Sequence, residues 1–134
     1  MDSINIRKSN LVYLELSYKI VGILFSVFNG IGGQHYEKNI QRAIEIKLRE
    51  SAIEYRRELV SPIRLNGKRV GQYRFDFLIE EKIILEIKRG RRFVPCHFKQ
   101  LKTYISAHNI PLGILAIFTE SEVKFARVVN FSVC

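Results

Sequence analysis

Two carboxylates and a lysine stand close together in two neighbouring strand-like runs, GQYRFDFLI and KIILEIK. Because side chains alternate faces along a strand, Glu86 and Lys88 project to one side of the second run. Asp76 projects to one side of the first run with its neighbours Arg74 and Leu78. The opposite face of that run is aromatic and carries Tyr73, Phe75 and Phe77.

The loop between the runs decides whether the acids meet. A three-residue turn over residues 80–82 pairs the runs as an antiparallel hairpin, with Asp76 opposite Glu86 and Arg74 opposite Lys88. A two-residue turn would put Asp76 opposite Leu85 instead. The three-residue register makes the two carboxylates direct neighbours.

Facing carboxylates are destabilising unless a cation offsets their charge. Mg²⁺ does this with one or two carboxylates, and takes its other ligands from water and phosphate oxygens. Lys88 is placed to orient or help deprotonate an attacking water. The spacing therefore indicates metal-assisted hydrolysis of a phosphodiester. The alternative is a solvated hairpin face with ordinary charges.

Length and composition predict an intracellular globular protein. The 134 residues, of which 47% are hydrophobic, suit one domain over residues 1–134 with a real core. No secretory signal is visible in MDSINIRKSN, and the charge-free stretch 20–31 is too short to span a membrane. We therefore expect a cytoplasmic location. Cys96 and Cys134 lack CxxC spacing, which predicts neither a disulfide framework nor a zinc site.

The net charge of +9 points to a polyanionic partner. Between Lys88 and Lys102 the chain carries six basic residues and no acidic one. A membrane surface would require an amphipathic helix rich in lysine, which is not seen, so nucleic acid is the expected partner. A solubilising loop is the alternative. The residues expected to bind nucleic acid are Arg74, Arg89, Arg91, Arg92, Lys99 and Lys102.

The chain reads as eight elements in the order ααβββαββ. A mostly apolar helix is expected from a cap at Ser9 or Asn10 to the glycines at 30–33, largely buried. A second helix over residues 35–50 has Ile40, Ile44 and Leu48 as its core stripe. We predict strands over 54–65, 70–79, 83–88, 112–118 and 123–131, and a helix over 97–108. This order implies an α/β fold with a mixed central sheet flanked by helices on both faces.

Three further polar residues lie on helix faces that turn inward. Glu37 shares the stripe of Ile40 and Ile44, so it can approach the two strand acids, although a first-turn glutamate also simply favours the helix dipole. Gln100 and Tyr104 are four residues apart on the later helix and share a face, with His97 one turn earlier. They can bind a phosphate or orient a water, or form only a boundary pair. No second histidine stands at metal spacing to His97, so a histidine-bound metal is not expected.

Together these residues resemble the PD-(D/E)XK nuclease superfamily, in its exonuclease-like branch with a QxxxY motif. Three segments, LSYKIVGILFSVFNGIGGQHYEKNIQRAIEIKLRE, GQYRFDFLIEEKIILEIK and HFKQLKTYI, are similar to the small GxxExxY proteins of that superfamily. The namesake motif is altered, since Gln34 stands in place of its glycine and Ile40 in place of its tyrosine.

The resemblance implies a restriction-endonuclease-like fold and a Mg²⁺-dependent or Mn²⁺-dependent nuclease. Its catalytic set would be Lys88, Glu37, Asp76, Glu86, Gln100 and Tyr104. Its metal ligands would be Asp76, Glu86, the backbone carbonyl of Ile87, and Glu37. DNA is the more expected substrate, cleaved to a product with a 5′-phosphate, in repair, recombination or defence.

Two other functions remain open from the residues. A non-catalytic nucleic-acid-binding module would keep the fold and the basic residues without the chemistry. A subunit of a larger nuclease complex, or a homodimer, would gain from its partner the surface that a chain this small lacks.

Overall fold

The computed structural model describes the backbone of residues 3–130 and the side chains of residues 13–130. Within this range the elements follow the order predicted from the sequence. They are α1 (Ser3–Ile31), α2 (Glu37–Glu50), β1 (Tyr55–Leu65), β2 (Lys68–Ile79), β3 (Ile83–Arg89), α3 (Pro95–Ala107), β4 (Leu112–Phe118) and β5 (Val123–Val129).

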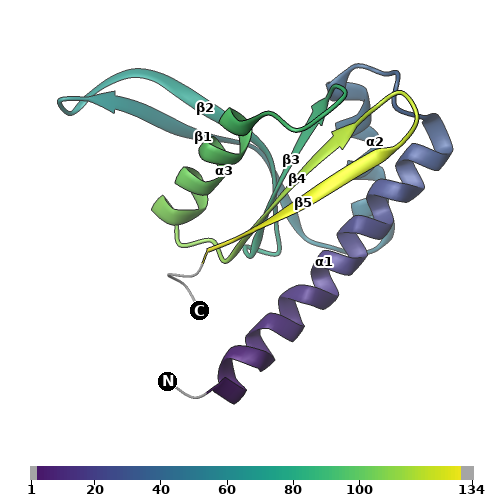
Figure 1. Ribbon diagram of the computed structural model, residues 1–134, viewed down its shortest axis with the longest axis horizontal. Helices are drawn as coiled ribbons and strands as arrows, with labels where there is room; N and C mark the ends of the chain where they lie inside the picture. Colours follow the sequence, from purple (N-terminus) through teal and green to yellow (C-terminus); the bar gives the residue numbers. More distant parts are fainter. Residues whose placement is uncertain (1–2, 131–134) are drawn as a thin grey trace.

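The five strands form one mixed sheet in the order β1-β2-β3-β4-β5. Only β3 and β4 run parallel, and α3 makes the crossover between them. Helices α1 and α2 cover one face of the sheet, and α3 covers the other (Figure 1). The predicted α/β architecture, with helices on both faces of a mixed sheet, is confirmed, and it is consistent with a restriction-endonuclease-like fold.

Helix α1 differs from its prediction in two ways. It begins at Ser3 instead of after Ser9 or Asn10, so it is longer than expected. Over residues 13–31, whose side chains the structure describes, it is also not largely buried, because one stripe contacts the sheet. Tyr18 is 78% exposed and Phe25 is 45% exposed on the outer side. The helix ends at the predicted glycines, where Gly32 adopts a left-handed φ of 77°.

The apolar part of α1 is longer than the charge-free segment 20–31. The window Tyr13–Ile31 is long and apolar enough to cross a membrane, a test that core helices of soluble proteins also pass. Here 28% of that window is buried inside the fold.

Helix α2 and the β2–β3 hairpin form as the sequence pattern predicts. Ile40, Ile44 and Leu48 are fully buried and face the sheet. Residues 80–82 make a three-residue turn, and Ile79 pairs with Ile83, which is the register that sets Asp76 and Glu86 level with each other.

The β1–β2 hairpin does not keep the strict face alternation expected of it. Phe77 packs in the core under α1 and α2, whereas Phe75 and Leu78 pack in the core under α3. The change of face occurs at Asp76 and at the facing residue Glu58, whose φ of 55° is left-handed. Tyr73 and Phe75 share a face as expected, but the expected place of Phe77 on that face is wrong, because both strands bend at this point.

The same bend ends the pairing of β2 with β3. The ladder stops at Phe77↔Leu85, so Arg74 does not pair with Lys88 as predicted. Instead Arg74 pairs with Val60 of β1, since the hairpin has turned away from the sheet. Of the two cysteines, Cys96 is free and exposed, and Cys134 lies outside the described residues.

Candidate active site

Asp76 and Glu86 meet where β2 separates from β3. The carboxylate of Asp76 takes the place of the missing ladder, accepting the backbone N–H of Ile87 at 2.7 Å from Oδ2. Glu86 is only 6% exposed, and its carboxyl group donates a hydrogen bond to Asp76. The predicted juxtaposition of the two acids is therefore present.

Burial makes this pair hard to ionise. Loss of solvent raises the pKa of Glu86 to about 10, and the hydrogen bond and negative charge of Asp76 act in the same direction. Burial also raises the pKa of Asp76, although the hydrogen bonds from Glu86 and Ile87 oppose the rise. Lys88 lowers the pKa of both groups but does not offset the burial. The site thus holds one proton more than two free carboxylates would hold at neutral pH.

Lys88 and Glu37 border the pair. Lys88 is half-buried and projects from the same face of β3 as Glu86, while Leu85 and Ile87 project into the core on the other face. Glu37 is half-buried at the start of α2, and its Oε1 accepts the backbone N–H of Arg89 at 3.2 Å. The charge of Glu37 acts on both strand acids, which places it near the pair.

The site contains two adjacent acids and a third at their margin, and not a close group of three. Among the described side chains, no three Asp, Glu, His or Cys residues are gathered tightly enough to hold a metal by themselves. Asp76 and Glu86 are the two adjacent carboxylates, with Glu37 at their margin. A metal with a full shell of protein ligands does not fit this arrangement, but Mg²⁺, which keeps waters and phosphate oxygens, does.

A chain of polar contacts behind Asp76 was not expected from the sequence. Gln41 donates from Nε2 to Asp76 Oδ1 at 2.9 Å, and its Oε1 accepts from Arg57 at 2.7 Å. Arg57 is paired in turn with Glu45 at 3.4 Å and lies over the ring of Phe77. These contacts hold the Asp76 carboxylate in one orientation. The sequence held one signal that could have identified Gln41, its spacing: it follows Glu37 by one helical turn.

Helix α3 places its polar residues at different distances from the acids. His97 is half-buried at its start, and burial together with the charge of Lys88 lowers its pKa while Glu37 opposes. His97 therefore lies near the site, on the helix face where the sequence placed it with Gln100. Gln100 follows on the same helix and is half-buried.

Tyr104 lies deeper in the core. Its ring packs on Phe75 with centroids 4.2 Å apart, and burial raises its pKa. The charges that act on its hydroxyl are Arg56 and Glu81, beside the β2–β3 turn and away from the acid pair. Through its contact with Phe75, Tyr104 thus supports β2, the strand that carries Asp76.

A groove beside Glu37 collects part of the predicted basic set. Arg89 and Arg91 line a cavity of about 470 Å³ together with Gln34, Thr119 and the acid Glu120. The cavity lies at the carboxyl ends of β3 and β4. Arg92, Lys99, Lys102 and Arg74 are all exposed, on the loop after β3, on α3 and on β2.

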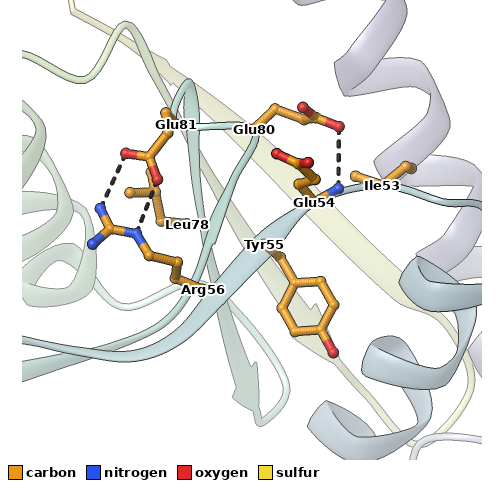
Figure 2. Close-up of a pocket in the computed structure, with 7 residues that line it drawn as sticks. All are labelled: Ile53, Glu54, Tyr55, Arg56, Leu78, Glu80 and Glu81. Atoms are coloured by element: carbon orange, nitrogen blue, oxygen red, sulfur yellow. Dashed lines mark hydrogen bonds and ion pairs between the residues drawn. The ribbon is translucent and has the colours of Figure 1, made fainter.

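A second pocket has the opposite character (Figure 2). It has a volume of about 370 Å³, lies at the turn end of the β2–β3 hairpin and is lined by Glu54, Glu80 and Glu81. Arg56 is paired with Glu81 at 2.9 Å, and Glu80 accepts the backbone N–H of Glu54 at 3.1 Å. Its acidic lining is less suited to phosphate than the groove at the other end of β3, where Arg89 and Arg91 outnumber the one acid, Glu120.

The fold of the chain is similar to two solved structures. One is the crystal structure of the protein SSO0001, with a TM-score of 0.55 and 22% identity. The other is an alkaline exonuclease (LHK-Exo) from Laribacter hongkongensis, with a TM-score of 0.50 and 13% identity. Each alignment covers 69% of this chain, which spans about half of either structure (49% and 54%).

A comparison with curated protein sequences found no match. A family model does match, over residues 14–128, and its description is the PD-(D/E)XK nuclease superfamily. That range contains every residue of the candidate site. The acid pair on adjoining strands, the lysine two residues on and the family match lead to one conclusion: this chain belongs to the PD-(D/E)XK nuclease superfamily.

Proposed function

We propose that the protein is a metal-dependent nuclease that hydrolyses phosphodiester bonds of DNA. The observation that carries the proposal is the buried, hydrogen-bonded pair of Asp76 and Glu86 with Lys88 beside it. Membership of a nuclease superfamily and a fold similar to that of an exonuclease support it.

The oxygen atoms at the site suit Mg²⁺ or Mn²⁺. Asp76 and Glu86 would supply carboxylate ligands, the backbone carbonyl of Ile87 a third oxygen, and Glu37 an auxiliary ligand. When bound, the metal polarises the phosphate and makes water a stronger nucleophile at neutral pH. Glu86 would lose its proton on binding, because the ligand form is the carboxylate.

The remaining residues orient the reactants. Lys88 holds and helps deprotonate the attacking water, and its charge favours the ionised acids. Gln41 keeps the Asp76 carboxylate in place through the contact at 2.9 Å. Gln100 and Tyr104 support the site from α3. Arg89 and Arg91 bind backbone phosphates in the groove next to Glu37.

A nuclease assay tests this proposal directly. We expect cleavage of DNA with Mg²⁺ or Mn²⁺, none with EDTA, and a loss of at least about 100-fold in Asp76→Ala and Lys88→Ala. Single-stranded, double-stranded and branched DNA and RNA would be compared. Lys82→Ala is the matched control, since this exposed lysine lies at the far end of the hairpin.

A second readout separates binding of the metal from catalysis. Calorimetric titration of the wild type with Mg²⁺ should show binding and release of about one proton, seen as a dependence of the heat on buffer. Glu86→Gln should bind Mg²⁺ at least about ten-fold more weakly. Equal activity in the wild type, Asp76→Ala and Lys88→Ala would reject the proposal. Salt-sensitive DNA binding without cleavage would identify a non-catalytic module instead.

A further inference from the structure

The β1–β2 hairpin continues far past the sheet. We call the part beyond Leu59 and Phe75, residues 60–74, the arm. It extends away from the other strands at the upper left of Figure 1. Residues 64–70 are all exposed, on both faces of the hairpin. The free end of the arm therefore adds nothing to the core, and a two-stranded hairpin without a core is marginally stable in water.

The arm carries charge of one sign only. It contains Arg64, Lys68, Arg69 and Arg74, and no Asp or Glu. None of these residues belongs to the basic stretch between Lys88 and Lys102, and only Arg74 is among the residues expected from the sequence to bind nucleic acid. A surface with several positive charges and no negative one suits a polyanion.

The outer edge of the arm is poorly suited to a partner strand. Pro62 has no N–H to donate, and the pairing register shifts between Ile63 and Arg64. Both features protect edge strands from pairing with other chains. The positive charge of the arm and its unsuitable outer edge together favour nucleic acid over a protein strand as the partner that binds the arm.

The arm starts at the candidate active site itself. Its two strands bend at Glu58 and Asp76, and the tip is the turn Asn66–Gly67, where both φ angles are positive (51° and 78°). Gly67 lies nine residues before Asp76, which at ~3.3 Å per residue gives a reach of roughly 30 Å. One turn of B-DNA is about 34 Å, and its major groove admits a two-stranded ribbon.

We propose that the arm binds double-stranded DNA in or along the major groove, about one helical turn from the phosphate held at Asp76 and Glu86. The inference rests on the proposed function for the position of that phosphate. It adds a substrate class, because a single strand has no groove to receive the arm.

The test measures binding, so it does not depend on cleavage. Fluorescence anisotropy would compare a labelled 20-base-pair duplex with the matching single strand, each with wild type and with an R64Q/K68Q/R69Q variant, in EDTA. A K19Q/K82Q/R127Q variant is the control, since it removes the same charge from exposed positions outside the arm.

The arm variant should bind the duplex about 10-fold to 100-fold more weakly, with a salt slope smaller by about 2 to 3. Its binding of the single strand should change by less than about three-fold, and the control should bind both as the wild type does. A circular dichroism spectrum and melting temperature equal to those of the wild type would show that the core is intact.

Three results would overturn the inference: unchanged duplex binding by the arm variant, equal loss for duplex and single strand, or equal loss in the control. A shortened arm, with Ile63 joined to Gly71 through Asn-Gly, gives a second test and should show the same selective loss. Failure of the proposed function looks different, since wild-type protein would then bind duplex through the arm without cutting it.

Discussion

Glu86 is the residue whose chemistry departs most from its type. It is 6% exposed, donates a hydrogen bond to Asp76 and has a pKa raised by burial to about 10. An unfolded glutamate has a pKa near 4.5. The metal-free site is therefore stabilised by a proton on Glu86, which a bound cation would displace.

This raised pKa predicts how the stability of the metal-free protein depends on pH. Between about 4.5 and about 10 the folded chain holds a proton that the unfolded chain has released, so the free energy of unfolding falls as pH rises. We expect a loss on the order of 1 kcal/mol per pH unit. Glu86→Gln keeps the neutral shape without the proton, and its dependence on pH should be shallower.

Urea unfolding in EDTA at pH 5.5 and 8.5 measures both proteins. Glu50→Gln is the control, because this glutamate is exposed at the end of α2 and should keep the dependence of the wild type. Identical pH dependence in wild type and Glu86→Gln would show that Glu86 is ionised in the metal-free fold.

The loop between α1 and α2 is packed closely against the end of the sheet at Gly33. Gly33 lies against the β4–β5 turn so closely that an added Cβ would be 2.0 Å from the carbonyl oxygen of Thr119. This contact fixes the start of α2, where Glu37 accepts the N–H of Arg89. The loop thus sets how near Glu37 comes to the strand acids.

Gly33→Ala should move this loop and weaken the site. We expect a loss of about 2 kcal/mol or more in the free energy of unfolding, because the clash is with backbone. Mg²⁺ affinity should fall with it. Gly30→Ala is the matched control: nothing lies within 4 Å of its added Cβ, and alanine favours a helix.

Urea unfolding and calorimetric Mg²⁺ titration check both variants. A Gly33→Ala protein as stable as Gly30→Ala, with wild-type Mg²⁺ affinity, would contradict the positioning of Glu37 by this loop.

Across the whole molecule, charge is unevenly distributed. The groove beside Glu37 and the arm are basic, whereas the pocket in Figure 2 at the turn end of the hairpin is acidic. A polyanion bound to the basic side would pass the acid pair and avoid the acidic pocket. The net charge of +9 adds a long-range attraction that salt screens.

The basic loop after β3 should act on every kind of DNA. An R89Q/R91Q/R92Q variant should bind both single-stranded and duplex DNA more weakly than the wild type does, by the same factor for each. Its salt slope should be lower by about 2 to 3. The backbone contact of Arg89 with Glu37 survives in this variant, so the fold should be unaffected. Anisotropy titrations at several salt concentrations measure this, and a loss confined to duplex would contradict a general phosphate contact.

Local sequence patterns were sufficient to predict much of the fold and the candidate site. Alternation in KIILEIK and the three-residue turn at 80–82 predicted the register that sets Asp76 level with Glu86, because turn length fixes hairpin pairing. The stripe of Ile40, Ile44 and Leu48 predicted the face of α2 that carries Glu37. Each of these depends on neighbours within a few residues.

Contacts between distant segments settled the rest. The bend at Glu58 and Asp76 depends on Phe77 packing under one layer and Phe75 under the other, which alternation cannot anticipate. The contact of Gln41 with Asp76 joins residues 35 positions apart. The outer side of α1 is exposed because a helix that packs on one face of a sheet contacts it along one stripe. Burial, which arises only when these layers close, gives Glu86 its pKa.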